Sequence, residues 1–239
     1  MLNIILHKIR KKLFSFLYPR EARIVKYVRE KNLTYCGYPK LENMSILIMK
    51  LRKMNIPGIY VEAGVALGGS AILIAKLKEP TAPLYLYDVF GMIPPPSAAD
   101  GTDAHHRYSV ITSGNSVGLG NDQYYGYRPD VKSAVIKNIE EAGVNLQRNN
   151  IHLIEGFFEN TMTISTEVAF AHIDADWYES VKTCINRISP NVSLGGIIIF
   201  DDYNSYSGCK KAVDEFLLTH RDFRIILNDR STVISRVNV

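Results

Sequence analysis

Residues 58–78 read GIYVEAGVALGGSAILIAKLK, and this stretch decides the fold of the 239-residue chain. Its first six residues form a largely apolar run that predicts a buried strand. A glycine-rich turn follows, in which Gly64 and Gly68 permit a sharp turn and a close approach of a ligand to the backbone. The run from Ser70 to Lys78 then predicts a helix, so the stretch supplies the first strand and helix of an α/β sheet.

Further strands and helices alternate along the rest of the chain. Strands are predicted at residues 84–89, 151–154, 168–173 and 196–200, and helices at about 130–142, 178–188 and 208–220. This alternation predicts a mostly parallel sheet with helices on both faces. The last two strands, 223–227 and 232–237, are joined by only four residues and must therefore be antiparallel. We expect an α/β, Rossmann-like sheet that ends in this hairpin.

The composition is that of an ordinary globular protein, with 46% hydrophobic and 22% charged residues. No apolar run reaches the roughly 18 to 20 residues that a membrane-spanning helix needs. The three cysteines, Cys36, Cys184 and Cys209, lack metal-ligand spacing. Their sparse use predicts a reducing, cytoplasmic location.

Positive charge is concentrated at the start of the chain. Residues 1–31 carry nine Lys or Arg against two Glu, a net charge of +7, whereas the other 208 residues carry a net charge of −3. The body therefore lacks the clustered basic groove that nucleic acid requires, and no nucleic-acid partner is expected. We expect a basic N-terminal segment at residues 1–34, followed by one domain at residues 35–239.

Apolar residues recur every three or four positions between Leu2 and Leu17, with basic residues between them. This period predicts an amphipathic helix that ends near Pro19. Charges interrupt its apolar side, which disfavours a secretory signal. Two interpretations remain open for residues 1–18: peripheral contact with the inner face of a membrane, or packing against the body or a second subunit of a homodimer.

Residues 91–130 have no sustained period and contain three consecutive prolines, six glycines and four tyrosines. A loop of this length in a compact domain is usually a functional lid or a disordered linker. Its aromatic content and its position directly after a strand favour a lid.

Acidic residues follow nearly every central strand. In order along the chain they are Glu62, Asp88, Glu155, Asp174 with Asp176, and Asp201 with Asp202. Ligands of open α/β sheets bind beyond the carboxyl ends of the strands, so these side chains are expected along one edge. Their mutual repulsion predicts a cationic ligand or a metal ion at that edge.

The first turn differs from a dinucleotide-binding loop because residue 66 is Ala, which breaks the G-x-G-x-x-G pattern. Glu62 is a poor neighbour for pyrophosphate and suits a positively charged ligand such as S-adenosylmethionine. Gly64 and Gly68 are candidate contacts for the same ligand. Asp88 ends the second strand, where a carboxylate can accept both ribose hydroxyls.

Asp174, Asp201 and Asp202 form a second group of candidates, at the ends of two neighbouring strands. Three hard oxygen ligands with open positions suit Mg²⁺. A divalent ion would lower the pKa of an alcohol, and Asp174 and Asp176 are the candidate bases that remove its proton.

Two polar residues near this group are given structural roles instead. His172 lies within an apolar strand and is expected to be a core histidine with its hydrogen bonds satisfied. Ser207 precedes Gly208 and is expected to cap the N-terminus of the following helix.

Five motifs of the chain resemble those of the TylF/MycF family of macrocin-type O-methyltransferases, which act on sugar hydroxyls. They are PGIYVEAGVALGGS at 57–70, LYLYDVFGM at 84–92, HIDADWYES at 172–180, GGIIIFDDY at 195–203 and GCKKAVDEF at 208–216. The resemblance covers about residues 35–237. It implies a class I methyltransferase fold, S-adenosylmethionine as the methyl donor and Mg²⁺ as a cofactor.

The resemblance also implies roles for single residues. Mg²⁺ would be held by Asp174, Asp201 and Asp202. The donor would be contacted by Glu62, Gly64, Ser70 and Asp88, and its adenine would be walled by Gly156 and Phe157. The acceptor would be a sugar of a glycoside, a glycan, or a nucleotide- or lipid-linked sugar, with specificity carried by residues 91–130.

Two alternative functions are compatible with the same residues. One is a catechol-type O-methyltransferase that acts on a small phenol. The other is a non-catalytic protein that retains the S-adenosylmethionine site as a scaffold.

Overall fold

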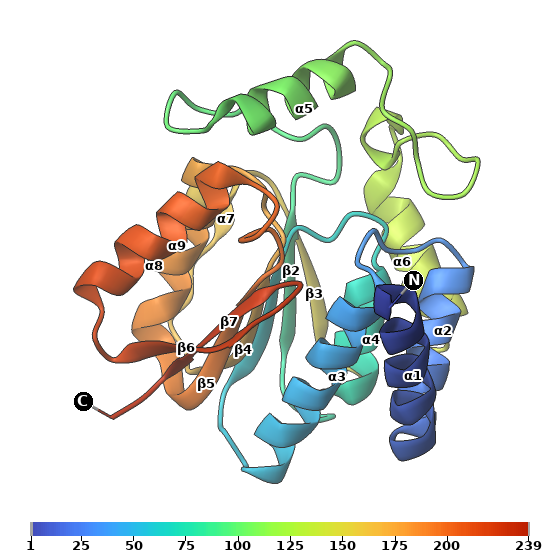
Figure 1. Cartoon of the computed structure of the whole chain (residues 1–239), viewed down its shortest axis with the longest axis vertical. Helices are drawn as coiled ribbons and strands as arrows, with labels where there is room; N and C mark the ends of the chain where they lie inside the picture. Colours follow the sequence, from blue (N-terminus) through green and yellow to red (C-terminus); the bar gives the residue numbers. More distant parts are fainter. Residues whose placement is uncertain (1, 239) are drawn as a thin grey trace.

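The computed structural model describes residues 2–238, with side chains described from Ile9 onward. Its centre is a seven-stranded sheet in the order β3-β2-β1-β4-β5-β7-β6 (Figure 1). The strands are β1 (Ile59–Ala63), β2 (Leu84–Asp88), β3 (Ile151–Glu155), β4 (Val168–Ile173), β5 (Val192–Phe200), β6 (Phe223–Asn228) and β7 (Thr232–Arg236).

The first five strands are parallel, and the last two reverse direction. β1 pairs with β2 and β4, β2 with β3, and β4 with β5, all in parallel. β7 runs antiparallel to both β5 and β6. The predicted fold class, a mostly parallel sheet closed by an antiparallel hairpin, is therefore confirmed.

Helices cover both faces of the sheet (Figure 1). One layer holds α1 (Leu2–Leu17), α2 (Pro19–Glu30), α3 (Tyr38–Lys53), α4 (Gly69–Leu77) and α6 (Val131–Glu141), and the other holds α7 (Phe158–Thr161), α8 (Tyr178–Ile188) and α9 (Ser207–Thr219). Short 3₁₀ turns occupy Tyr125–Tyr127 (η1) and Ser189–Asn191 (η2). The four helices that the sequence predicts after β1, namely α4, α6, α8 and α9, are present within one or two residues of their expected bounds.

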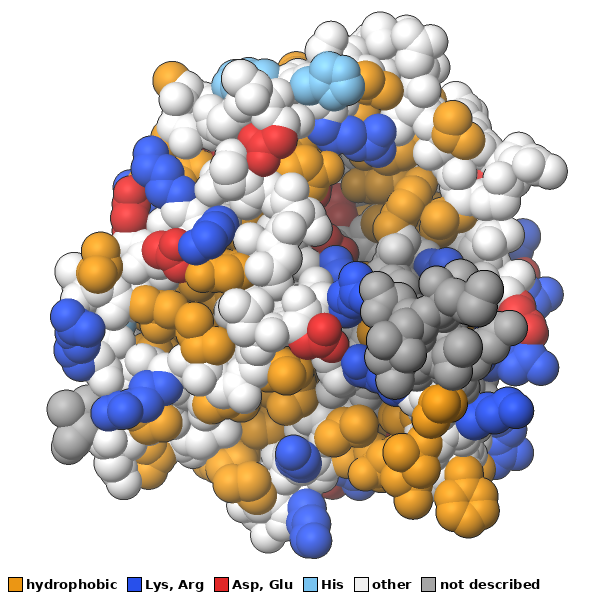
Figure 2. Space-filling model, viewed as in Figure 1, with side chains coloured by type: hydrophobic (Ala, Val, Ile, Leu, Met, Phe, Trp, Pro, Cys, Tyr) orange, Lys and Arg blue, Asp and Glu red, His pale blue; other side chains and the backbone are white. Residues whose placement is uncertain are grey.

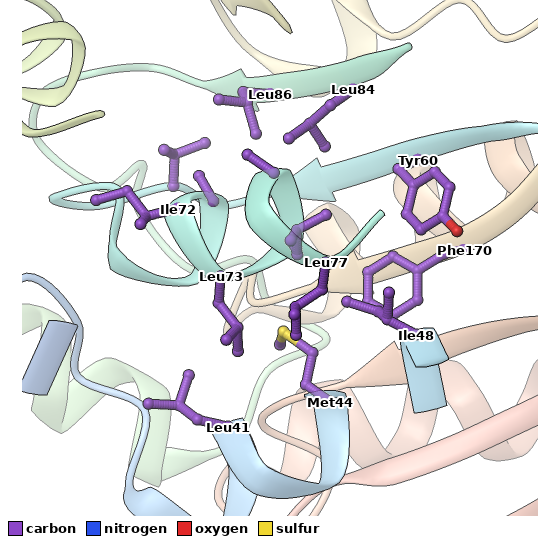
Figure 3. Close-up of a cluster of buried hydrophobic side chains, with 14 of the residues drawn as sticks. Leu41, Met44, Ile48, Tyr60, Ile72, Leu73, Leu77, Leu84, Leu86 and Phe170 are labelled. Atoms are coloured by element: carbon purple, nitrogen blue, oxygen red, sulfur yellow. The ribbon is translucent and has the colours of Figure 1, made fainter. Parts of the chain in front are cut away.

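Helix α4 is almost entirely buried. Ile72, Leu73 and Leu77 are almost completely inaccessible to solvent. They pack between Leu41 and Met44 of α3 on one side and the strands on the other (Figure 3). Full burial of each such side chain contributes about 1.5–3 kcal/mol, so this packing fixes the turn between β1 and α4.

The N-terminal helix packs on the body with only part of its apolar side. α1 ends at Leu17, as predicted, and a second helix that the sequence analysis did not predict, α2, begins at Pro19. Phe14 is buried, whereas Ile9, Leu13, Phe16 and Leu17 are all more than half exposed. A membrane surface and a second subunit both remain predictions for the partner of this exposed side. Within the described part of the chain, every helix is too short or too polar to traverse a bilayer.

The segment at residues 91–130 contains more structure than its sequence suggests. It includes an 11-residue helix, α5 (Thr102–Thr112), which stands above the carboxyl end of the sheet (Figure 1). The sequence shows no helical repeat of apolar residues here because α5 buries only Ala104 and Ile111, so the helix could not be recognised from periodicity. The segment also begins and ends at one place, since a Cβ at Gly126 would lie 3.3 Å from the carbonyl oxygen of Gly91. We refer to residues 91–130 as the lid.

Candidate active site

The backbone hydrogen bonds of the parallel sheet continue one residue beyond the ends of β1, β4 and β5. They hold the loops that follow these three strands side by side. The Gly64 amide donates to the Tyr87 carbonyl, the Asp174 amide to Ala63, and the Asp201 amide to Ile173, at 2.8–2.9 Å. Gly64 has a φ of +89°, and a Cβ there would overlap the Asp174 carbonyl. The β1 loop and the β4 loop are therefore in direct backbone contact, and only glycine permits it.

The three aspartates that follow β4 and β5 converge. One carboxylate oxygen from each of Asp174, Asp201 and Asp202 lies within 4.8 Å of the other two. Mg²⁺ binds oxygen at about 2.0–2.1 Å, which separates its ligand atoms by about 3–4 Å, so a small contraction would accommodate the ion. Asp202 Oδ2 is buried and has no hydrogen-bond partner among the described residues. The side chains meet as predicted, and their role as metal ligands stays a prediction.

Burial and repulsion shape the protonation of this cluster. Burial raises the pKa of Asp174, and Asp201 and Asp202 raise it further. Burial and the charge of Asp201 likewise raise the pKa of Asp202. Burial would also raise the pKa of Asp201, but His172 and Lys40 lower it below the ordinary value. A divalent cation would relieve the remaining repulsion.

Lys40 is a functional-site residue that the sequence analysis missed. It lies in the first turn of α3, and its Nζ forms an ion pair with Asp201 Oδ2 at 2.5 Å and a hydrogen bond with the Asp201 carbonyl at 2.9 Å. Burial lowers the pKa of this ammonium, but the charge and hydrogen bond of Asp201 and the charge of Asp202 together outweigh burial and raise it. Lys40 therefore holds Asp201 ionised.

Two pockets meet at this edge of the sheet, below the lid. The acidic pocket, of about 270 Å³, lies over the three aspartates. The β2 pocket, of about 120 Å³, lies between the end of β2, the lid prolines and α7. Figure 2 shows the hollow beneath the lid, with acidic side chains in its depth. The residues that line both pockets are Gly64, Ile93, Tyr125, Asp174, Asp176 and Trp177.

Asp176 stands at the junction of the two pockets, outside the cluster of three aspartates. Its backbone has a φ of +53°, a left-handed conformation that Asp tolerates better than most residues. Burial raises the pKa of its carboxyl, and Asp202 and Asp201 raise it further. The side chain is therefore a stronger base than an ordinary aspartate when it is ionised.

Asp88 organises the β1 loop. Its Oδ2 accepts hydrogen bonds from the amides of Val65 and Ala66 at 2.6 and 3.1 Å, and its Oδ1 accepts one from Phe90 at 2.7 Å. The residue also lines the β2 pocket. Backbone amides therefore already occupy much of the hydrogen-bonding capacity of this carboxylate. Its contact with the ribose hydroxyls of the donor stays a prediction.

Glu62 and His172 form a buried pair below the pockets. His172 Nδ1 lies 3.0 Å from Glu62 Oε1, and both side chains are completely inaccessible to solvent. Glu62 Oε2 and His172 Nε2 have no hydrogen-bond partner in the described part of the chain. The expectation that His172 is a fully satisfied core histidine is therefore wrong for one ring nitrogen. Glu62 lines neither pocket, so its predicted donor contact depends on its unpaired oxygen.

Of the other predicted donor-binding residues, Phe157 lines the β2 pocket, whereas Gly68, Ser70 and Gly156 line neither pocket. Phe157 is half exposed and comes directly after Gly156, which has a φ of +139°. Gly68 precedes α4, and Ser70 is buried in the first turn of that helix. Donor binding by these four residues stays a prediction.

Three side-chain contacts fasten the lid to the body. Trp177 Nε1 donates to the Pro94 carbonyl at 2.8 Å. The Tyr178 amide donates to Asp100 Oδ1 at 2.7 Å. Asp103 accepts hydrogen bonds from both the amide and the hydroxyl of Ser207. The prediction that Ser207 caps α9 is wrong: it is the first residue of that helix, and Asp103 of the lid satisfies its amide.

The strand order, the reversed final hairpin and the pockets over the carboxyl ends of the strands define a methyltransferase of the α/β class. The family model of macrocin-O-methyltransferases, TylF, matches residues 28–225. The protein therefore belongs to the macrocin-O-methyltransferase family. It is an S-adenosylmethionine-dependent O-methyltransferase, as its motifs predict.

Named relatives and solved structures agree with this assignment. The chain is 28% identical over 189 residues to demethyldecarbamoylnovobiocin O-methyltransferase of Streptomyces niveus, with 77% of this chain and 67% of that protein covered. It is 26% identical, with the same coverage, to a Streptomyces olivaceus enzyme named as an 8-demethyl-8-(2,3-dimethoxy-alpha-L-rhamnosyl)-tetracenomycin-C 4'-O-methyltransferase. The solved structure of the O-methyltransferase NovP superposes with a TM-score of 0.71 at 25% identity, covering 89% of this chain and 88% of that one.

Proposed function

We propose that this enzyme methylates a sugar hydroxyl, with Mg²⁺ held by Asp174, Asp201 and Asp202. The observation that carries the proposal is the meeting of the two pockets at Asp174 and Asp176, beside the three-aspartate cluster. The β2 pocket has the place and lining for the donor nucleoside, with Asp88 and Phe157 in its wall. The acidic pocket then receives the acceptor.

The chemistry of the acidic pocket fits the alkylation of an alcohol. The bound ion would lower the pKa of an acceptor hydroxyl, as divalent cations do for water. Asp176 would take the hydroxyl proton, because its carboxylate is buried, more basic than usual and outside the cluster of ligands. The proton leaves the acceptor as the oxygen attacks the methyl carbon, and the donor leaves as a neutral thioether.

The lid residues set the shape of the acceptor pocket. Tyr124 and Arg107 line it from above, and Arg107 lies over the Tyr124 ring at 5.7 Å. Trp177 closes its floor from the β4 loop. Aromatic faces and a guanidinium suit a polar ring with hydroxyls, and the rhamnosyl group in the name of one relative supports a sugar.

The test is methyl transfer from S-adenosylmethionine to a panel of neutral glycosides, nucleotide sugars and phenols, each with Mg²⁺ and with EDTA. We expect product with a glycoside or a nucleotide sugar in the presence of Mg²⁺, and loss of product with EDTA. Product formed only from catechol would show that the methyl-accepting substrate is a phenol and not a sugar. Undiminished product in EDTA would refute the metal assignment and leave the methyl transfer intact.

A further inference from the structure

The two oxygens of Asp201 face different surroundings. Oδ2 is paired with Lys40. Oδ1 faces away from that ion pair, at 3.7 Å from Cys36 Sγ and 3.7 Å from His172 Nε2. Ligand atoms of Cys36, His172 and Asp201 all lie within 4.8 Å of one another, and all three side chains are buried. This Cys-His-Asp cluster is distinct from the three-aspartate cluster but shares Asp201 with it.

The distances fit a tetrahedral metal ion. Zinc binds sulfur at about 2.3 Å, imidazole nitrogen at about 2.0–2.1 Å and carboxylate oxygen at about 2.0–2.2 Å. At a tetrahedral angle these bond lengths separate the ligand atoms by about 3.3–3.6 Å. The two measured separations from Asp201 Oδ1 are 3.7 Å, slightly wider than this. The separation from His172 Nε2 is too long for an N–H···O hydrogen bond, so the imidazole is aimed at the carboxylate without a hydrogen bond, whereas the Cys36 thiol donates a weak S–H···O hydrogen bond to the same oxygen.

The buried histidine supplies an independent observation. Its Nδ1 is bonded to Glu62 Oε1, whereas its Nε2 is buried without a hydrogen-bond partner among the residues described and lies 3.7 Å from Asp201 Oδ1. A histidine that binds metal through one nitrogen almost always donates its other N–H to a carboxylate, a backbone carbonyl or a water. Glu62 and His172 already have this arrangement. An unpaired buried nitrogen is costly unless something binds it.

We propose that Cys36, His172 and Asp201 form a site for a thiophilic divalent cation, with Zn²⁺ as the chemical type. A thiolate and an imidazole select zinc or a similar ion over magnesium, whose preferred ligands are hard oxygens. The two clusters share Asp201, and Cys36 Sγ also lies 3.9 Å from Asp174 Oδ2. Two divalent ions would be close neighbours and would repel one another, so we expect occupancy of one site to weaken the other. Zinc at this site would therefore inhibit the magnesium-dependent enzyme. Asp174 Oδ2, at 3.9 Å from Cys36 Sγ, is close enough to become a fourth ligand after a small shift.

Binding at this site releases protons. Burial and the charge of Asp201 raise the pKa of the Cys36 thiol, so the thiol is protonated in the metal-free protein. A bound cation displaces this proton to solvent, since the thiolate is the form that binds metal. The proton that His172 holds on Nε2 is displaced in the same way, while the one on Nδ1 remains with Glu62.

The first test uses Co²⁺ as a spectroscopic probe of the full-length protein after treatment with EDTA. We expect a thiolate-to-cobalt charge-transfer band that saturates at one equivalent of Co²⁺. Cys36→Ser should abolish this band, and Glu62→Gln should weaken cobalt binding about 10- to 100-fold. Cys209→Ser is the matched control, because Cys209 is also buried and lies outside the cluster. Cobalt binding without a thiolate band, or a band that survives in Cys36→Ser, would overturn the proposal.

The second test measures exclusion between the two sites. Mn²⁺ serves as the probe of the three-aspartate cluster, and its release is followed by the electron paramagnetic resonance signal of the free ion. Zn²⁺ should release Mn²⁺ from the wild type, and Cys36→Ser should need at least about tenfold more Zn²⁺ for half release. Equal release from both proteins would show that zinc binds only the aspartates and would refute the site.

The cobalt test separates the inference from the proposed function, on which the inhibitory consequence and the Mn²⁺ test rest. Neither readout requires a methyl donor or an acceptor. A protein that binds cobalt through Cys36 but methylates no sugar would retain the inference and lose the proposed function. Circular dichroism and a thermal melt of Cys36→Ser, a nearly isosteric change, exclude misfolding as the cause of a lost band.

Discussion

The two sides of the active site are held by different kinds of contact. On the strand side, backbone hydrogen bonds join the β1, β4 and β5 loops, and the Asp88 carboxylate secures the β1 loop. On the lid side, hydrogen bonds and packing of side chains, among them Asp100, Trp177 and Tyr125, connect the lid to the body. Under the proposed function, the strand side is therefore preorganised for the donor and the cation. The lid would shape the acceptor pocket and would also supply one wall of the β2 pocket.

The largest expected effect comes from the strand side. Asp174→Asn should lower methyl transfer by about 10³-fold, because it removes one of the three clustered carboxylates beside the reacting oxygen. Donor binding, measured by calorimetry, should remain. Glu155→Gln is the matched control, since Glu155 also ends a strand but is exposed and paired with Lys132. A loss of less than tenfold in Asp174→Asn would contradict the role of the cluster.

Two glycines with similar backbone angles allow a direct comparison of stability. Gly64→Ala should cost about 3 kcal/mol or more, because the new Cβ meets the Asp174 backbone in addition to an unfavourable φ of +89°. Gly114→Ala, in the lid, should cost only about 1–2 kcal/mol, since its φ is +77° but nothing lies within 4 Å. Urea denaturation of both variants measures the difference. Equal costs would show that the β1 loop can adjust as readily as the lid.

A smaller effect is expected when the lid is unfastened. Asp100→Ala removes the carboxylate that accepts hydrogen bonds from the amides of Tyr178 and Ser97. We therefore expect the KM for the methyl-accepting substrate to be about tenfold higher. The dissociation constant of the donor should rise less than this KM, although Ser97 also lines the β2 pocket. Asp122→Ala, an exposed lid variant, serves as the control. A donor affinity that weakens in Asp100→Ala as much as the KM rises would mean that the lid holds the donor as firmly as the acceptor.

An effect confined to alkaline pH is expected from His172 in the metal-free protein. Burial lowers the pKa of this imidazole, but Asp201 and Glu62 outweigh burial and raise it to about 10, above the unfolded value of about 6.5. The stabilisation is therefore complete below pH 6.5 and is lost as the pH rises through 10. In EDTA, the free energy of unfolding of the wild type should fall over this range more than that of His172→Gln. Parallel pH curves for the two proteins would rule out the charged pair.

Much of the sheet could be predicted because its strands are short apolar runs between turn residues. β5 is the exception: the prediction began at Gly196, whereas the strand begins at Val192. Gly195, with a φ of +79°, interrupts the apolar run inside the strand, and the pairing with β4 shifts there. Periodicity cannot distinguish such an irregularity from a strand end.

The acidic cluster could be predicted because parallel strands bring their carboxyl ends to one edge. The partners that come from other elements could not. Lys40 lies 161 residues before Asp201 along the chain and Cys36 lies 165 residues before it, and no local spacing connects them. Several buried carboxylates in one place imply that a cation lies nearby. The packing of α3 against the sheet determines that this cation is Lys40.

The proximity of Gly91 to Gly126 has a consequence for how this enzyme diversifies. The chain leaves the core and returns to it at nearly the same point, so the two ends of the lid lie close together. Such a loop can be exchanged for one of another length without changing the path of the strands around it. Grafting the corresponding segment of a related enzyme onto this scaffold is therefore a direct route to new substrates, with the alkylation chemistry inherited unchanged.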